Sequence, residues 1–190
     1  GYLPFTGRIS PEKRVDRAIR IARTVGIPLK IPAKVDRVDV EYFKAEIEPM
    51  LSGPGVEYIG EIDERSKPDF LGHACGVLFP IDWPEPFGLV MIEAMACGTP
   101  VLAFDKGSVP EVIDEGVTGF IVQTEEEAIC KLRDLLALDR GRVRRRFEER
   151  FTAERMAADY VRLYKTLFAA GTERRALRLV SASDNKAIAQ

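Results

Sequence analysis

Two glutamates flank the most apolar stretch of the chain. Glu85 precedes the glycine Gly88, and Glu93 lies eight residues after Glu85. Between Pro86 and Phe104, Glu93 is the only Asp, Glu, Lys or Arg. A helix without a polar face is normally buried on every side, and a lone carboxylate there is unfavourable unless hydrogen bonds satisfy it. Two carboxylates beside a glycine-opened helix therefore predict a site for a ligand with both hydroxyls and anionic groups.

A second candidate group lies near the start of the chain. Gly7 and Arg8 close the first predicted strand, and Lys13 lies in the first turn of the next helix. The two cations can converge on one anion, although taken alone they are also explained as surface cations on a basic helix. Free N–H groups at Gly88 and Leu89 suit a phosphate, although they also mark a simple helix start. Together these groups would neutralise a diphosphate without metal.

Alternating strands and helices must position these residues. Ser10 is predicted to cap the first helix, with Pro11 at its first position. The alternation predicts an α/β fold, a Rossmann-like parallel sheet with helices on both faces. The predicted strands are 2–6, 28–33, 56–59, 76–80, 101–104 and 119–122, and the later predicted helices are 40–51, 65–74, 88–97, 109–115, 124–138 and 152–168.

Four charged residues fall just after predicted strands. They are Arg8, Lys34, Glu61 and Asp82. Ligands of parallel α/β sheets bind outside the carboxyl ends of the strands. We therefore expect these four side chains to gather along one sheet edge, the edge that also presents Gly88.

The composition sets broad bounds on function. The chain has 190 residues, 46% of them hydrophobic, and a formal net charge of -2, which gives no argument for nucleic acid or an acidic membrane surface. No stretch approaches the roughly 20 apolar residues of a membrane span. No Cys and His residues have metal-ligand spacing, so no metal site is predicted. The cysteines are predicted to be buried, reduced thiols; they are Cys75, Cys97 and Cys130.

The chain is expected to hold one domain, 1–170, followed by a polar, poorly ordered tail, 171–190. It opens with Gly1 already close to an apolar strand, which suggests a domain cut from something longer. The basic run GRVRRRFEERF after Arg140 is interpreted as a solvated helix face or as a contact for phosphate or lipid headgroups.

Three motifs carry a family resemblance. They are GRISPEK at Gly7–Lys13, EPFGLVMIEAMACGTPV at Glu85–Val101 and GSVPEVIDEGVTGFIV at Gly107–Val122. They resemble the retaining GT-B glycosyltransferases of family 4, and the similarity extends to about Leu167. The resembled part is the second, donor-binding domain, and nothing in the chain corresponds to the N-terminal acceptor domain.

The resemblance implies a role for each candidate residue. Arg8 and Lys13 would hold the donor diphosphate, Glu85 the transferred sugar, and Glu93 the ribose hydroxyls. The alternatives are a structural pair of Glu93 with an Arg or Lys, and a solvated loop position for Glu85. The backbone near Ile62 would border the base. The implied catalytic residues are Arg8, Lys13 and Glu85, and the implied binding residues are Gly7, Ile62, Phe87, Gly88, Leu89 and Glu93.

The chain departs from the family at three places. Arg14 follows the lysine where glycine is frequent, Ser108 replaces a second glycine, and AKVDRVD at 33–39 replaces a glycine-rich turn. Lys34 in that segment is interpreted as an extra cation for phosphate or sugar, or as a solvated loop residue. None of these changes removes a core contact.

The implied function is donor binding in a retaining transfer of sugar from a UDP-, GDP- or ADP-sugar, without metal. A nucleotide-sugar epimerase and a non-catalytic nucleotide-sugar-binding module remain alternatives. The expected partners are the nucleotide sugar and the absent N-terminal domain, and no nucleic acid. A cytoplasmic location is expected, with at most peripheral membrane contact.

Overall fold

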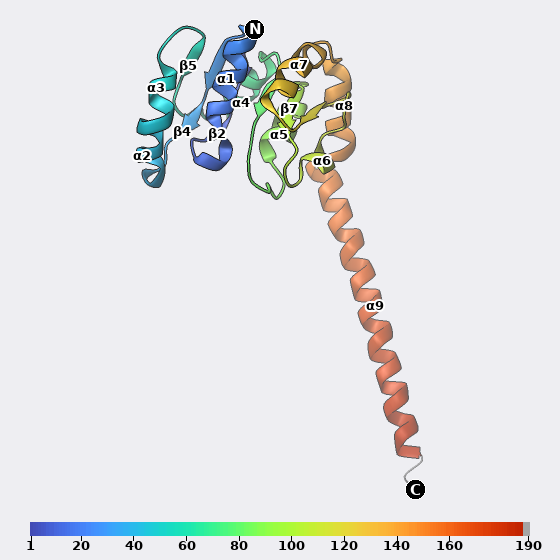
Figure 1. Cartoon of the computed structure of the whole chain (residues 1–190). Helices are drawn as coiled ribbons and strands as arrows, with labels where there is room; N and C mark the ends of the chain where they lie inside the picture. The colour runs from blue at the N-terminus through green and yellow to red at the C-terminus, as the bar shows by residue number, and fades with distance from the viewer. Residues whose placement is uncertain (188–190) are drawn as a thin grey trace. The chain divides into compact units, whose positions relative to one another are not determined.

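The structure is a computed structural model that describes the backbone of residues 1–187 and the side chains of residues 1–170. Contacts divide the chain into two units, Gly1–Glu148 and Glu149–Gln190. The strands and all the candidate site residues belong to the first unit (Figure 1). The predicted extent of the functional domain, 1–170, stays a prediction.

The first unit contains two three-stranded parallel sheets that lie side by side. β1 (Leu3–Pro4) contacts β6 (Val77–Phe79) at their junction. The backbone N–H of Cys75 donates to the carbonyl of Tyr2 at 2.9 Å, just before both strands. The spatial order is therefore β5, β3, β1, β6, β7, β8, which places the first strand at the centre as in doubly wound folds. The other strands are β3 (Leu29–Ile31), β5 (Val56–Tyr58), β7 (Val101–Phe104) and β8 (Gly119–Val122).

Short strands continue two members of the first sheet. β2 (Gly7–Arg8) pairs in parallel with β4 (Ala33–Lys34), with Arg8 opposite Lys34. The predicted strands 2–6 and 28–33 are thus each broken once. Because β2 and β4 follow β1 and β3, they carry their charged residues beyond the carboxyl edge of the sheet.

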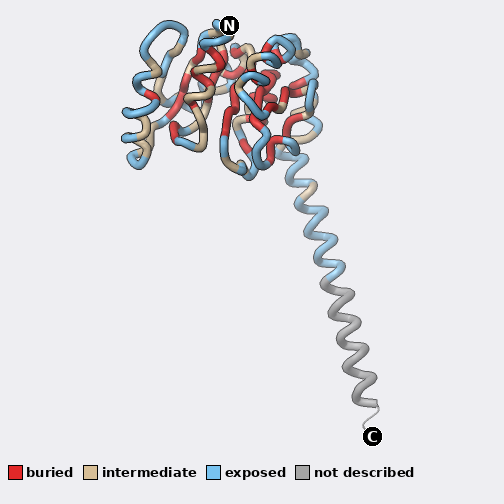
Figure 2. Tube along the Cα trace, in the orientation of Figure 1, coloured by how far each residue is buried: buried red, intermediate tan, exposed pale blue. Residues whose placement is uncertain are grey.

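Helices cover both faces of the sheet. All residues of β6 and β7 are buried, as parallel strands are when both faces are covered (Figure 2). α1 (Val15–Val25) packs against α7 (Glu125–Leu136), while α4 (Lys67–Gly72) packs against α5 (Leu89–Ala96). The predicted fold class is therefore confirmed.

The predicted helix 40–51 forms with an irregular middle. α2 (Val40–Tyr42) leads into a π-helical turn, η3 (Phe43–Ile47), and then into α3 (Glu48–Leu51). Pro49 lacks the N–H that would bond to the preceding turn, so a local change in hydrogen-bond spacing is expected there. The remaining elements are η1 (Pro11–Lys13), η2 (Arg37–Asp39), α6 (Val109–Val112), α8 (Arg140–Arg150) and α9 (Ala153–Ala187).

The start of the first helix differs from the prediction. Ser10 makes no capping hydrogen bond, and its buried hydroxyl has no partner among the described residues. The turn η1 intervenes, and Arg14 caps α1 with φ 54° and ψ 48°. This left-handed conformation costs an L-residue about 1 kcal/mol and suits the glycine frequent at this point in the family. Ion pairs of Arg14 with Asp16 at 2.9 Å and with Asp82 at 3.3 Å offset that cost.

The second unit is described by itself. The predicted helix 152–168 forms as the start of α9, and it carries exposed apolar side chains at Met156, Tyr160, Tyr164, Leu167 and Phe168. The structure contains no described helix with the length and apolar character needed to cross a bilayer. The order of the tail 171–190 stays a prediction, because its side chains and the backbone of residues 188–190 lie outside the described part.

In the first unit Cys130 is exposed, so the prediction of a buried thiol is wrong at that position.

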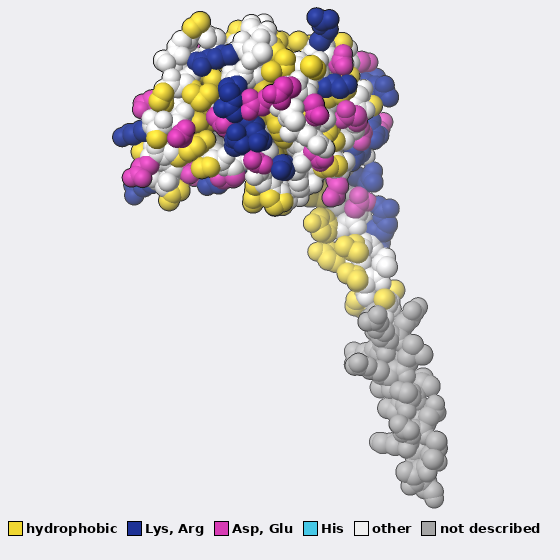
Figure 3. All heavy atoms as spheres, in the orientation of Figure 1, with side chains coloured by type: hydrophobic (Ala, Val, Ile, Leu, Met, Phe, Trp, Pro, Cys, Tyr) yellow, Lys and Arg dark blue, Asp and Glu magenta, His cyan; other side chains and the backbone are white. Residues whose placement is uncertain are grey.

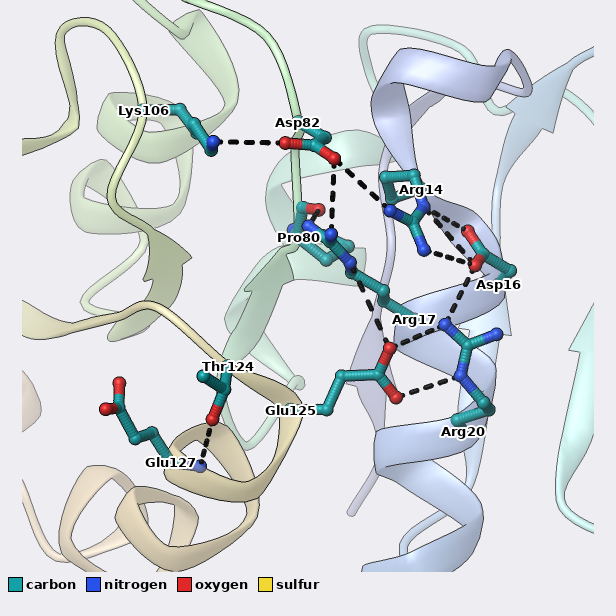
Figure 4. A network of polar contacts seen from close by, with 10 residues as sticks. All are labelled: Arg14, Asp16, Arg17, Arg20, Pro80, Asp82, Lys106, Thr124, Glu125 and Glu127. Atoms are coloured by element: carbon teal, nitrogen blue, oxygen red, sulfur yellow. Dashed lines mark hydrogen bonds and ion pairs between the residues drawn. The ribbon is translucent and has the colours of Figure 1, made fainter.

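A network of ion pairs ties α1 to α7 (Figure 4). Arg20 binds both carboxylate oxygens of Glu125, at 2.5 and 2.9 Å, and also binds Asp16 at 2.8 Å. The hydrogen bond from Arg20 lowers the pKa of Glu125. Arg17 reaches Asp82 at 3.2 Å and lies over the ring of Phe104 at 4.9 Å. The network therefore holds the helix of the first half against elements of the second half.

We expect this network to make the first unit sensitive to acid. The pKa of Glu125 is lowered in the fold, so its contribution is present above its unfolded pKa of about 4.3 and is lost as the pH falls through the folded value. Glu125→Gln should reduce the free energy of unfolding at pH 7 by about 1 kcal/mol and flatten its decline between about pH 5 and 3. Urea unfolding followed across this pH range measures both. Glu126→Gln, at an exposed position on the same helix, is the control; equal pH slopes in the two variants would contradict the expectation.

Candidate functional site

A cleft of about 270 Å³ opens beyond the carboxyl ends of the strands of the first sheet. It brings together Gly7 and Arg8 on β2, Ile62 after β5, and Glu93 on α5. Lys34 and Glu61, which were expected at the same edge, also line it, whereas Asp82 does not. The lining residues are Thr6, Gly7, Arg8, Pro32, Ala33, Lys34, Glu61, Ile62, Glu64, Lys67, Val90 and Glu93.

Glu93 lies on the side of α5 that faces this cleft. Its side chain is 33% exposed and accepts a hydrogen bond from Lys67 at 3.1 Å. Lys67 also pairs with Glu64 at 2.8 Å. Partial burial disfavours the ammonium, but the hydrogen bonds to Glu64 and Glu93 outweigh it and raise the pKa of Lys67. Glu93 is therefore paired with a lysine, which is the structural alternative to ribose binding, although the sequence did not single out Lys67 as the partner.

The prediction that α5 is buried on every side is wrong. Leu89 is 63% exposed, and only Met91, Ala94 and Met95 of the helix are buried. The apolar composition reflects packing of one side against β6 and β7, while the other side borders open clefts. A neighbouring cleft of about 500 Å³ shares Glu64, Lys67 and Glu93 with the first and extends to Arg144.

Arg8 and Lys34 form a basic rim on the cleft. Arg8 pairs with Glu12 and Asp36, both at 3.3 Å, and its side chain is 50% exposed. Lys34 pairs with Asp36 at 3.7 Å and with Glu61 at 4.0 Å. Exposed pairs of this length contribute little free energy. An incoming anion could therefore pair with Arg8 and Lys34 at a small cost in free energy, because the ion pairs that it replaces are weak.

The other predicted catalytic residues form a compact cluster. Lys13 Nζ lies 2.5 Å from Glu85 Oε2, and the two side chains are only 19% and 14% exposed. Trp83 Nε1 donates to the same oxygen at 2.9 Å, and Lys13 Nζ lies 5.2 Å from the centre of the Trp83 ring. Sequence reasoning missed Trp83. The available signal was that Trp83 is the one tryptophan of the chain, two residues before Glu85.

The loop that carries this cluster is clamped through its backbone. Asp82 N–H donates to the carbonyl of Glu12 at 2.8 Å, and Ser108 N–H donates to that of Glu85 at 2.9 Å. The Asp82 side chain binds Lys106 at 3.1 Å, which lowers the pKa of that carboxyl. Asp82, predicted to join the charged edge, thus anchors the loop in the network of Figure 4.

Gly88 opens α5 as predicted, with φ 77° at the N-cap. It is buried beside Glu85, since a Cβ at Gly88 would lie 3.4 Å from Glu85 Cγ. Phe87 and Leu89 are exposed on either side of it and do not line the cleft. The structure therefore places the nine predicted residues in three groups. Gly7, Arg8, Ile62 and Glu93 line the cleft, Lys13, Glu85 and Gly88 cluster, and Phe87 and Leu89 border the helix start.

Charges of both signs are mixed on the face of the first unit that Figure 3 draws. Among the described residues, no group of three or more His, Cys, Asp or Glu could hold a metal ion. The metal independence of the chemistry stays a prediction.

The fold is a Rossmann-like α/β unit with a cleft beyond the carboxyl edge of its sheet. The family profile described as glycosyl transferases group 1 matches residues 1–153. The chain therefore belongs to this family of glycosyltransferases. The match covers every element that lines the cleft.

Relatives give the same classification. D-inositol 3-phosphate glycosyltransferase from Mycobacterium bovis is 43% identical over 167 residues, covering 78% of this chain and 33% of the relative. The structure of AviGT4, a glycosyltransferase involved in avilamycin A biosynthesis, is 29% identical with a TM-score of 0.75, covering 89% of this chain and 52% of that one. HepE from Anabaena shares the fold at 19% identity and a TM-score of 0.74, covering 87% and 49%. The chain thus spans about half of these structures, and less of the curated relative.

Gly107 provides a test of how tightly the Glu85 loop is held. Its φ is 57°, and a Cβ there would lie 2.4 Å from both the backbone N and O of Glu85. Gly107→Ala must therefore displace the loop in addition to straining its own backbone. Gly116 has φ 71° with no atom within 4 Å of its Cβ position, so Gly116→Ala is a matched control for the strain alone.

We expect Gly116→Ala to cost about 1 kcal/mol and Gly107→Ala about 1–3 kcal/mol more, measured by denaturant unfolding. The emission of Trp83 should shift in Gly107→Ala because its loop moves, and should not shift in Gly116→Ala. Equal stabilities with an unshifted emission would show that the loop is not held by this contact.

Proposed function

We propose that the chain is the donor-binding domain of a retaining glycosyltransferase that moves a sugar from a nucleotide sugar to an acceptor hydroxyl without metal. The carrying observation is the cleft at the sheet edge, which combines Glu93, a basic rim and the backbone after β5. A carboxylate suits the vicinal hydroxyls of a ribose, and cations suit a diphosphate. Membership in glycosyl transferases group 1 supports the same class of chemistry.

In this proposal each part of the donor has its own contact. Glu93 accepts hydrogen bonds from the ribose hydroxyls and exchanges Lys67 for them. Arg8 and Lys13 bind the diphosphate and stabilise the departing nucleoside diphosphate. The backbone at Ile62 borders the base, and Glu85 contacts the transferred sugar. Negative charge develops on the diphosphate as the sugar leaves it. Fixed cations at that position, here Arg8 and Lys13, would stabilise the transition state.

Gly88, Phe87 and Leu89 complete the proposed phosphate and sugar contacts through backbone amides at the start of α5, and the backbone of Gly7 lets the donor approach β2. Structures of HepE were obtained in complex with UDP and with UDP-glucose, although at 18–20% identity they support only the shared fold. A UDP-, GDP- or ADP-sugar is the proposed donor class. We place the reaction in the cytoplasm, with at most peripheral membrane contact of the whole enzyme.

The first test is nucleotide binding. Calorimetry with UDP, GDP and ADP in the presence of EDTA should show binding of at least one of them. Glu93→Ala should weaken that affinity about tenfold, because it removes charge-assisted hydrogen bonds to ribose. Glu126→Ala, which removes an exposed carboxylate from α7, is the matched control and should bind as the unmodified chain does. Failure of all three nucleotides at millimolar concentration, or equal affinities of the two variants, would overturn the proposal.

The second test separates binding from turnover. We expect this chain alone to bind donor but to transfer no sugar, because an acceptor hydroxyl must be held against the anomeric carbon and that proximity supplies several kcal/mol. The proposed partner is an N-terminal acceptor-binding domain. Radiolabelled donor is incubated with this chain and with a longer protein that joins it to that domain. Comparable transfer by both would contradict the two-domain account, and binding without transfer by both would favour the non-catalytic module.

A further inference from the structure

Trp83 contacts both members of the Lys13–Glu85 pair. Its indole N–H donates to Glu85 Oε2 at 2.9 Å, and Lys13 Nζ lies 5.2 Å from the centre of its ring. Lys13 binds the same oxygen at 2.5 Å. Both donors therefore converge on Oε2. Among the described residues, Glu85 Oε1 receives no hydrogen bond.

The backbone around Glu85 leaves its side chain little freedom. Glu85 N–H donates to the carbonyl of Trp83 at 2.8 Å, and Ser108 N–H donates to the carbonyl of Glu85 at 2.9 Å. Gly107 lies directly against the Glu85 backbone, where no Cβ would fit. The position of the carboxylate is thus set by this frame and by the two donors on Oε2.

Binding of a diphosphate changes this balance. If phosphate oxygens take Lys13, the carboxylate of Glu85 loses its cation while remaining 14% exposed. A carboxylate so little exposed is unfavourable without hydrogen bonds. The indole N–H of Trp83 is the described side-chain donor that remains on it.

We propose that Trp83 is a positioning residue that holds Glu85 while Lys13 is engaged by the donor diphosphate. This inference rests on the proposed function. The indole N–H keeps Oε2 occupied, so that Oε1 is presented to a hydroxyl of the transferred sugar. The ring provides a surface on which the ammonium of Lys13 moves from carboxylate to phosphate without losing its aromatic contact.

A double-mutant cycle on ligand affinity tests this role. Trp83→Phe keeps an aromatic ring and removes the N–H, and Glu85→Ala removes the carboxylate. The probes are UDP with UDP-glucose, GDP with GDP-mannose and ADP with ADP-glucose, measured by calorimetry. Trp83→Phe should weaken the free nucleotide, because release of Lys13 then leaves Glu85 without a donor, and should weaken the nucleotide sugar by a clearly larger factor, about tenfold, because Oε1 is also no longer presented to the sugar. In the Glu85→Ala background, Trp83→Phe should have no further effect, because it acts through Glu85.

The single tryptophan also gives a direct spectroscopic test. The ¹⁵N-labelled chain has one tryptophan indole N–H, which belongs to Trp83. Its proton resonance should move upfield in Glu85→Ala and should stay downfield when the unmodified chain is saturated with nucleoside diphosphate. A single cooperative thermal transition in Trp83→Phe confirms that this variant is folded.

The outcomes separate the inference from the function on which it rests. Absence of nucleotide binding to the unmodified chain would overturn the proposed function and this inference with it. Nucleotide binding with equal effects of Trp83→Phe on both ligands, multiplicative effects in the double variant, or an upfield indole on saturation would overturn the role of Trp83 alone.

Discussion

The ion pair between Lys13 and Glu85 is the contact on which the geometry of the candidate site depends. Its partners are 72 residues apart in sequence and follow β2 and β6, on the two sides of the junction between the sheets. They meet because β1 contacts β6, which brings together the loops of the two sheets. Lys13 Nζ and Glu85 Oε2 lie 2.5 Å apart and both side chains are little exposed to solvent. Loss of either partner would therefore leave an uncompensated, largely buried charge. The Lys13–Glu85 pair therefore holds the segment after β2 against the loop after β6. It also keeps together the two side chains that the proposed chemistry uses.

The charges of the site differ in how readily a ligand can recruit them. Arg8 and Lys34 are exposed cations whose carboxylate partners lie at 3.3–4.0 Å, so their pairing with a phosphate would cost little free energy. Lys13 is held more firmly, and its release requires that Glu85 keep another donor, which Trp83 supplies. Glu93 is paired with Lys67, which the ribose hydroxyls would replace in the proposed complex. Binding of the proposed donor would thus replace ion pairs within the protein by contacts between the protein and the donor. The binding free energy would reflect the difference between the two sets of contacts.

The fold was predictable from sequence because it rests on periodicity and chain order. β7 and β8 form at the predicted bounds, and the alternation predicted parallel strands with both faces covered. The site was predictable as a set of positions near strand ends, but its pairings were not. The left-handed Arg14 depends on ion pairs with Asp16 and Asp82 that only the folded chain assembles. Lys67 carries no spacing signal, and Trp83 is marked only as the single tryptophan of the chain, two residues before Glu85. The partial exposure of α5 depends on tertiary packing, which its apolar composition does not reveal.

The central claim is that the cleft at the sheet edge holds a nucleoside diphosphate. A crystal structure of the chain soaked with the nucleotide that binds it would test this most directly. The account predicts ribose hydroxyls within hydrogen-bond distance of Glu93, the diphosphate against Arg8 and Lys13, and Lys13 moved away from Glu85. A nucleotide bound in the neighbouring cleft beside Arg144, or in the predicted cleft with Lys13 still paired to Glu85, would contradict it.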